Sequence, residues 1–296
     1  MLCELVRIVP ACGVGLFLEF PWALTEIQGL GLPSIVYRTT RSPFQHGATL
    51  LGFVLEPRVV QIILHLRGCT RGDMWQKRRD IINVLNPLIG PFQLEMHMWD
   101  GTIYSLHDVV YDGRFQATIN ARGEPTVQSV GVRMLAQDPV WFGPAQRVIV
   151  TPGELRDELV LPAEFPIVFG ALAIVEEDLV LTVLGNWEAY PTIEIYGPMG
   201  SVLIENTTTD EKLELIYGIV AGDVVTIETA PGNKSITNVV GDNLVGYLTV
   251  DSDLATFHLD PAPLAPDGEN TLHFYGAASS LAAQFVVSWY DRYLGL

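Results

Sequence analysis

The feature that most constrains the fold of this 296-residue chain is a succession of short runs in which apolar and polar residues alternate. Alternation of this kind is typical of half-buried β-strands. The clearest run is ATLLGFVLEPRVVQIILHLRG at 48–68, which we expect to be one strand. One of its faces is wholly apolar, with Val60, Ile62, Leu64 and Leu66. The 27 glycines and 19 prolines follow no period and suit turns between strands, so the chain is predicted to be mainly β.

One stretch departs from this pattern and predicts an α-helix, at about 70–86. Thr70 is a candidate N-cap, and Asp73 lies in the first turn, where a carboxylate favours the positive end of the helix dipole. Asn86-Pro87 should end the helix, because proline cannot donate a backbone hydrogen bond and disfavours helix in its predecessor. The helix is expected to carry an apolar stripe formed by Met74, Trp75, Ile81, Ile82 and Leu85.

The rest of the sequence has the texture of strands. In the first half, Asp100-Gly101 between two alternating runs predicts a β-hairpin, followed by another strand at 125–136. Beyond residue 190, turns recur at roughly the 8–12-residue spacing of a β-sandwich. They separate eight expected strands: PTIEIYG, SVLIENTTT, EKLELIYGIV, DVVTIETA, KSITNVV, TFHLDP, NTLHFYG and AQFVVSWYDRY.

The net charge of −17 is distributed unevenly along the chain. Residues 1–146 carry 12 basic and 12 acidic residues, whereas residues 147–296 carry 5 basic and 22 acidic residues. This contrast predicts two domains, 1–146 and 147–296. The acidic second half should repel nucleic acid and anionic lipid. The short basic run Lys77-Arg78-Arg79 is interpreted as the solvated face of the helix rather than as a nucleic-acid site.

Cysteine usage and hydropathy bear on the compartment. The three cysteines, Cys3, Cys12 and Cys69, have neither a CxxC nor a metal-binding spacing, which favours synthesis in a reducing cytoplasm. The apolar start of the chain does not resemble a signal peptide, because acidic and proline residues interrupt it. Residues 159–184 have the length of a membrane span, but two prolines and three consecutive acids argue against insertion. We therefore expect a soluble protein.

Motifs for catalysis or cofactor binding are missing from the sequence. It contains no GxSxG, P-loop, helix-opening GxGxxG or HExxH motif, so we predict no enzyme activity and no cofactor. His97 and His107 flank the predicted hairpin and would meet a metal with Asp108, but strand histidines are more often structural, and no metal site is predicted. A glycosidase would need two acids about 5–9.5 Å apart around a cleft. Most of the acids instead occupy contexts typical of solvated surface charge.

Carbohydrate binding is an alternative function, because β-sandwiches can present aromatic side chains as flat platforms. Trp187 and Tyr190 in GNWEAYP are the candidate binding residues. Trp289 and Tyr290 in SWYDRY are further candidates, but Trp289 lies in an alternating run and is interpreted as a core residue. For Trp187 the simpler interpretation is packing at the entrance to the second domain.

The fragment MLAQDPVWFGP at 134–144 joins the two halves and is predicted to be an interdomain hinge. Proline cannot donate to a strand ladder, so Asp138-Pro139 and Gly143-Pro144 should stop strand pairing and fix the chain direction. Trp141 and Phe142 are expected to bury the joint between the domains. The alternative interpretation is a catalytic role for Asp138.

The order of several motifs resembles the distal tail proteins (Dit) of long-tailed bacteriophages. The resemblance covers the chain from about residue 35 onward; residues 1–33 contribute nothing to it. Each motif is weak by itself, but their order is fairly specific. The motifs are SPFQHGATLLG (42–52), a strand ending at Gly68, LNPLIGPFQL (85–94), VVYDG (109–113), MLAQDPVWFG (134–143), LPAEFPIVFG (161–170), GNWEAYPTIEIYGPMGSVLIENTTTDEKLEL (185–215), DVVTIETAPGNKSI (223–236) and the final NTLHFYG…VVSWYDRYLGL (271–296).

The resemblance implies a structural role in the virion. It implies an N-terminal β-sandwich or barrel-like domain that builds a ring, commonly a hexamer, and a C-terminal galectin-like β-sandwich that projects outward. Such a ring joins the tail tube to the baseplate hub or tail fibre, and in some phages it carries receptor-binding proteins. DNA would pass through the ring without specific binding. Lys77, Arg78 and Arg79 would then face a partner in the assembly. Binding of host-surface carbohydrate remains the alternative function.

Overall fold

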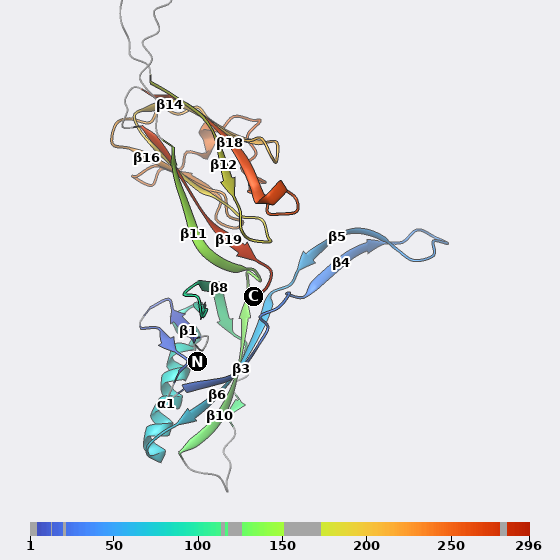
Figure 1. Cartoon of the computed structure of the whole chain (residues 1–296), viewed down its shortest axis with the longest axis vertical. Helices are drawn as coiled ribbons and strands as arrows, with labels where there is room; N and C mark the ends of the chain where they lie inside the picture. Colours follow the sequence, from blue (N-terminus) through green and yellow to red (C-terminus); the bar gives the residue numbers. More distant parts are fainter. Residues whose placement is uncertain are drawn as a thin grey trace, which may run out of the picture. The chain divides into compact units, whose positions relative to one another are not determined.

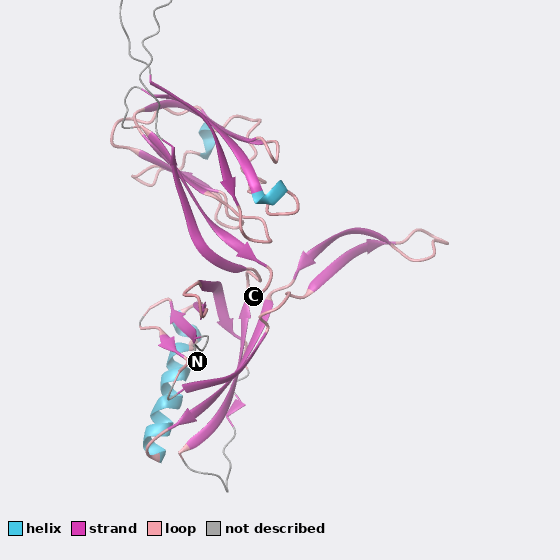
Figure 2. Cartoon of the chain, viewed as in Figure 1, coloured by secondary structure: helices cyan, strands magenta, loops and turns pink. Residues whose placement is uncertain are grey.

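The computed structural model describes residues 5–12, 14–19, 22–113, 116–117, 126–150, 173–278 and 283–296 (Figure 1). The chain divides into two compact units. The first consists of Met1–Pro144 with Tyr293–Leu296, and the second of Ala145–Arg292. Both are built mainly of strands (Figure 2), which confirms the predicted fold class. The LPAEFPIVFG segment and Cys3 lie outside the described residues.

The strands of the first unit pair antiparallel in an open sheet, not in a closed barrel. Along this sheet the order is β2-β1-β7-β8-β10-β6-β3, with β9 paired to β10 and the start of β11 paired to β8. The strands are β1 (Leu5–Pro10), β2 (Leu16–Phe17), β3 (Trp22–Gln28), β6 (Arg58–Arg67), β7 (Phe92–His97), β8 (Ile103–Tyr111), β9 (Gln116–Ala117) and β10 (Val127–Ala136). Strand β11 (Trp141–Val150) begins in this unit and continues into the second unit after Pro144.

Strand β6 confirms the predicted alternation, but the run at 48–68 is not one strand. One face of β6 is buried and consists of Val60, Ile62, Leu64 and Leu66. The residues on the opposite face of the same strand are more exposed. The strand begins only at Arg58, after Glu56-Pro57. Residues Thr49–Leu55 form a different strand, β5, which pairs with β4 (Ile35–Thr40) in a separate two-stranded sheet. The prediction of a single strand was wrong because Pro57 interrupts the run and the chain changes sheet there.

The predicted helix is present as α1 (Arg71–Val84), followed by a single 3₁₀ turn, η1 (Pro87–Ile89). Thr70 caps the helix by accepting a hydrogen bond from the backbone N–H of Asp73, as predicted. The helix packs against β1 and β6. The prediction that Ile82 belongs to the buried apolar stripe was wrong, because 43% of this residue is exposed. Met74, Ile81 and Leu85 of the same stripe are buried. No helix within the described ranges is long and apolar enough to cross a membrane.

The second unit is a β-sandwich. Its first sheet has the order β17-β16-β13-β19, and its second sheet has the order β12-β18-β14-β15. The inward side chains of both sheets form one core, which includes Ile193, Phe285, Phe274 and the loop residue Phe257. The strands are β12 (Ala173–Thr182), β13 (Thr192–Tyr196), β14 (Met199–Asn206), β15 (Glu211–Leu215), β16 (Val224–Glu228), β17 (Ser235–Thr237), β18 (Glu269–Ala278) and β19 (Gln284–Tyr293). Two 3₁₀ turns, η2 (Val245–Tyr247) and η3 (Pro266–Gly268), lie in its loops.

Two local predictions had different outcomes. The hairpin at Asp100-Gly101 is confirmed, since β7 and β8 pair on either side of it and Gly101 has a positive φ of 88°. The run TFHLDP is not a regular strand and makes only an isolated bridge between Leu259 and Ala189. Its alternation instead places Phe257 and Leu259 in the core while His258 and Asp260 take part in side-chain contacts.

Candidate assembly surface

Strands β4 and β5, with the connecting residues 41–48, form a two-stranded arm that extends from the rest of the first unit (Figure 1). The two strands pair antiparallel from Ile35↔Leu55 at the root to Thr40↔Thr49 near the tip. Neither pairs with any other strand in the described part of the chain. The arm therefore has two open strand edges and no core of its own.

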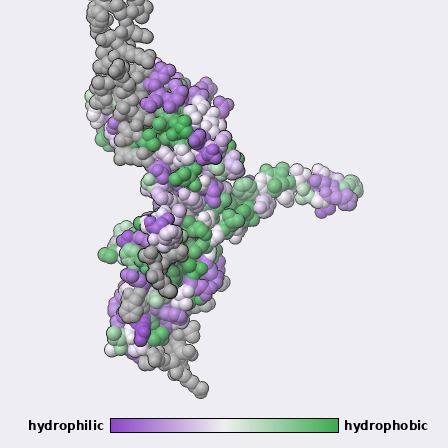
Figure 3. Space-filling model, in the orientation of Figure 1, coloured by the Kyte–Doolittle hydropathy of each residue, from purple (hydrophilic) through white to green (hydrophobic). Residues whose placement is uncertain are grey.

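Apolar side chains are exposed on both faces of the arm. Neighbouring residues of a strand point to opposite faces, and apolar neighbours such as Leu50-Leu51 are both exposed, with 68% of Leu51 accessible. In Figure 3, hydrophobic colouring covers the root and the middle of the arm, whereas much of its tip is hydrophilic. Residues 35–55 contain Arg38 and Arg41 but no acidic residue. The exposed apolar residues are Ile35, Val36, Tyr37, Phe44, Leu50, Leu51, Phe53 and Val54.

A small hydrogen-bond network shapes the tip of the arm. The Gln45 side chain accepts a bond from the Ser42 N–H and donates one to the Thr49 hydroxyl, and Arg41 donates to the Gln45 carbonyl. Phe44 is fully exposed at the end of this turn, with a positive φ of 65°. A bulky residue rarely adopts this conformation, so the fixed turn holds Phe44 outward at a local conformational cost.

The physical chemistry of the arm calls for a covering partner. An isolated two-stranded hairpin is at best marginally stable in water, and contiguous exposed apolar surface is typical of protein–protein contact sites. Open edges with exposed apolar side chains also invite strand pairing or packing by another chain. The arm is therefore the candidate functional site of the first unit.

The basic run on α1 is only partly available to a partner. Lys77 donates to the Asp73 carboxylate at 2.9 Å and to the Arg67 carbonyl, and its hydrogen bond, with that of the Cys69 N–H, lowers the pKa of Asp73. The guanidinium of Arg78 lies 5.1 Å from the centre of the Trp75 ring. Arg79 is exposed. Of the three predicted contact residues, Arg79 is thus the one whose side chain faces solvent most fully.

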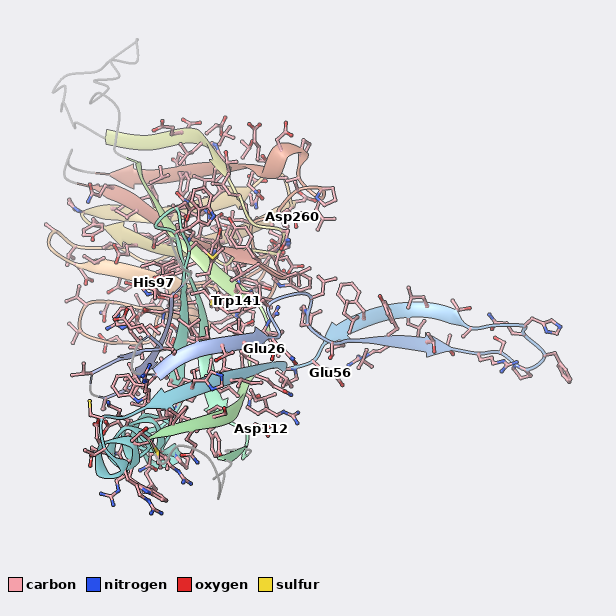
Figure 4. All side chains as sticks on the ribbon, turned by 60° about the horizontal axis from the view of Figure 1, so that its bottom comes forward. Glu26, Glu56, His97, Asp112, Trp141 and Asp260 are labelled. Carbon is pink, nitrogen blue, oxygen red and sulfur yellow. The ribbon has the colours of Figure 1, made fainter. Side chains whose placement is uncertain are left out.

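The predicted hinge residues lie in the turn after β10 and at the start of β11. Asp138 accepts a hydrogen bond from the Val140 N–H, and Pro139 lies in the same turn. Trp141 is completely buried and belongs to the core of the first unit (Figure 4). Phe142, Gly143 and Pro144 continue β11, and the division between the units follows Pro144. A hinge motion at this segment stays a prediction.

The candidate carbohydrate-binding aromatics occupy partly buried positions in the second unit. The Tyr190 hydroxyl donates to Glu188 at 2.8 Å, and the Arg292 guanidinium lies 5.2 Å from the Tyr190 ring centre. The backbone N–H of Trp187 donates to the Arg292 carbonyl. Trp289 is core and Tyr290 is exposed. Sugar binding by Trp187 and Tyr190 stays a prediction.

The two hairpin histidines have different partners. His97 contacts Glu95 at 3.1 Å and packs edge-on against Phe17, whereas His107 contacts Ser105 and stacks on Phe142 at 4.2 Å. Within the described residues, no group of three His, Cys, Asp or Glu side chains is arranged to hold a metal ion.

A charged cluster surrounds His258 in the second unit. One ring nitrogen, Nδ1, lies 2.8 Å from the Thr256 carbonyl oxygen and 3.2 Å from the Glu211 carboxylate, and Nε2 lies 3.1 Å from Asp260. All of these partners are acceptors, so the doubly protonated ring satisfies them best. Burial lowers the pKa of His258, but the Thr256 hydrogen bond and the charges of Glu211, Asp260 and Glu188 together raise it above 6.5.

This cluster predicts a pH dependence of the second unit. A raised pKa in the folded state stabilises the fold fully below pH 6.5, and this contribution is lost as the pH rises through the folded-state pKa. In urea unfolding from pH 5.5 to 9, we expect the wild-type chain to lose its stability advantage over His258→Gln as the pH rises. His46→Gln, on the exposed arm, is the control. An advantage that is constant with pH would refute the assignment.

Two elements of the first unit were not singled out by sequence reasoning. The second strand of the arm was predicted only as part of the single strand at 48–68, although Leu50-Leu51 and Phe53-Val54 leave it without a polar face. Arg58 was predicted to be part of a half-buried strand, but it is only 2% exposed. It directly follows Glu56-Pro57, and Glu56 is labelled at the root of the arm in Figure 4. Pro57, directly before Arg58, was the one signal in the sequence that a strand ends there and another begins.

Two family models match the chain. One, described as a phage tail protein RIFT-related domain, matches residues 12–123, and the other, described as a siphovirus-type tail component C-terminal domain, matches residues 184–293. No curated protein sequence is significantly similar to the chain.

Solved structures with the same fold include two phage tail proteins. The crystal structure of SPP1 Dit (gp 19.1), described as a paradigm of the hub adsorption apparatus in phages that infect Gram-positive bacteria, is 14% identical. It has a TM-score of 0.67, covering 97% of this chain and 98% of that one. A chain of the phage p2 baseplate in its activated conformation with Sr is 10% identical, with a TM-score of 0.51 and the same coverage.

The two domain models and the shared fold define a component of a long-tailed phage tail. The chain belongs to the siphovirus distal tail protein family. It is accordingly a tail protein of the virion.

Proposed function

We propose that copies of this chain assemble into a closed ring, six in number by family resemblance, at the distal end of the phage tail. The observation that carries the proposal is the arm, whose exposed apolar faces and open strand edges call for a partner. In the proposed ring, the arm packs on a different surface of the next copy. Such a contact is heterologous, and heterologous contacts close into rings when the rotation between copies allows it.

In this proposal the first unit builds the ring and the second, galectin-like unit lies at its periphery. The first half of the sequence is neutral overall, so its copies can pack without strong mutual repulsion. The acidic second half suits the outside, where copies are further apart. The ring would join the tail tube to the baseplate hub or tail fibre and serve as a scaffold for receptor-binding proteins. Its role is structural rather than enzymatic, and DNA passes through it without specific binding.

The oligomeric mass tests ring formation. In the proposed function the chain is made in the host cytoplasm before it joins the virion. In light scattering of the purified full chain, we expect a discrete species of about six times the 32.6 kDa chain mass. Negative-stain images of this species should show a central opening. Open filaments that grow with concentration, or a chain that stays monomeric at every concentration, would contradict self-assembly into a ring.

A second prediction concerns the basic run on α1. Arg79→Glu should weaken assembly or docking to a neighbouring tail protein, because it reverses an exposed charge and leaves the contacts of Lys77 and Arg78 in place. A rim charge of this kind is worth less than about 1 kcal/mol, so the effect should be severalfold and salt-dependent. Gln76→Glu, on the same helix, is the control. Equal assembly of both variants at low salt would contradict the prediction.

A further inference from the structure

Arg58 occupies the root of the arm and is almost completely buried. Its guanidinium donates to four backbone carbonyls: Gly29 at 2.7 Å, Pro139 at 2.6 Å, Leu294 at 2.5 Å and Gly31. Its centre lies 5.8 Å from the Trp141 ring centre. Burial lowers the pKa of Arg58 to about 10, against the opposing charge of Asp138, so the side chain remains a cation at neutral pH.

The four carbonyls come from segments that are distant in the sequence. Gly29 and Gly31 precede the first strand of the arm, and Arg58 itself follows the second strand, so both ends of the arm meet at this guanidinium. Pro139 lies shortly before Ala145, where the second unit begins, and Leu294 lies two residues after Arg292, where the second unit ends. One side chain thus binds both ends of the arm and both connecting segments.

Close backbone packing reinforces the same point. A side chain at Gly29 would approach the Val59 carbonyl oxygen to 2.2 Å, and one at Gly295 would lie 3.0 Å from Gly31. The Leu296 N–H donates to the Leu30 carbonyl at 3.0 Å. Residues 294–296 therefore lie directly on the segment that leads into the arm.

We propose that Arg58 is a positioning residue that fixes the direction of the arm and ties it to the two segments through which the chain enters and leaves the second unit. The planar guanidinium can hold several carbonyls in one fixed geometry, which a lysine cannot do. A displacement of either connecting segment then changes the hydrogen bonds by which Arg58 holds the root of the arm. In an assembled ring, which is the proposed function, this provides a route by which load on the second unit alters contact with the next copy.

The test measures the direction of the arm in single chains. Spin labels at His46→Cys on the arm and Gln76→Cys on α1, with Cys3, Cys12 and Cys69 changed to serine, report the distance between them. Labelled chains are diluted with unlabelled chains so that distances between copies do not contribute. We expect a narrow distance distribution for the wild-type background and for the control Arg38→Met, an exposed arginine on the arm. Arg58→Met and Arg58→Lys should both give broad distributions.

Deleting residues 294–296 should also broaden the distribution, but less than Arg58→Met does, because the deletion removes one of the four carbonyl acceptors of Arg58 and leaves the other three. Circular dichroism checks that each variant is folded; if Arg58→Met does not fold, Arg58→Lys and the deletion decide. Distributions in these variants as narrow as in the wild type would overturn the proposal. Absence of a ring in the unlabelled wild-type chain would instead contradict the proposed function and leave the role of Arg58 intact.

Discussion

We expect that replacing Leu50, Leu51 and Phe53 of the arm with threonine will abolish ring formation and leave the chain folded. Threonine keeps the strand preference of these positions, and all three side chains are exposed in the single chain, so its stability should change little. Buried anchor residues at interfaces are worth about 2 kcal/mol or more each, and 1.4 kcal/mol is a factor of ten. The association should therefore weaken at least on the order of a hundredfold.

Light scattering of this arm variant gives the answer directly. We expect monomers at concentrations at which the wild-type chain forms its discrete oligomer, with equal thermal unfolding of the two proteins. The matched control replaces exposed apolar residues of the second unit, Val180, Val220 and Val240, with threonine and should still assemble. An arm variant that assembles as the wild type does would show that the ring contact lies elsewhere.

The two cores should fail independently. Trp141→Ala removes a fully buried side chain from the core of the first unit, and Phe257→Ala does the same in the second unit. Truncations of buried aromatic residues cost about 3–5 kcal/mol. Calorimetry should show two transitions, with the first variant shifting one of them and the second variant shifting the other.

This experiment also bears on the hinge interpretation of the MLAQDPVWFGP segment. If Trp141 buried the joint between the domains, as the sequence suggested, its loss would destabilise both units together. Its place in the core of the first unit, beside Arg58, leads us to expect an effect on that unit alone. A simultaneous shift of both transitions in Trp141→Ala would restore the interdomain interpretation.

Much of the fold followed from local sequence patterns. The burial of alternate residues in β6, the Thr70 cap of α1 and the Asp100-Gly101 hairpin were all predicted, because each depends on side-chain period or turn chemistry within a few residues. Ile82 was misplaced at the edge of the helical stripe, where a small difference in angle decides between core and solvent.

The candidate site was harder to predict for a physical reason. Leu50, Leu51 and Phe53 are as apolar as core residues, and one sequence does not distinguish burial in the same chain from burial against another copy. Arg58 was missed because its four acceptors are backbone carbonyls. Such acceptors leave no trace in residue type, and they come together only through the tertiary fold.

The location of the chain in the virion tests the central claim most directly. Antibodies raised against the second unit and coupled to gold can be bound to intact tailed particles that contain this chain, and the particles then imaged. We expect gold only at the tip of the tail opposite the capsid. Gold along the whole length of the tail, or at the junction with the capsid, would contradict a ring at the distal end.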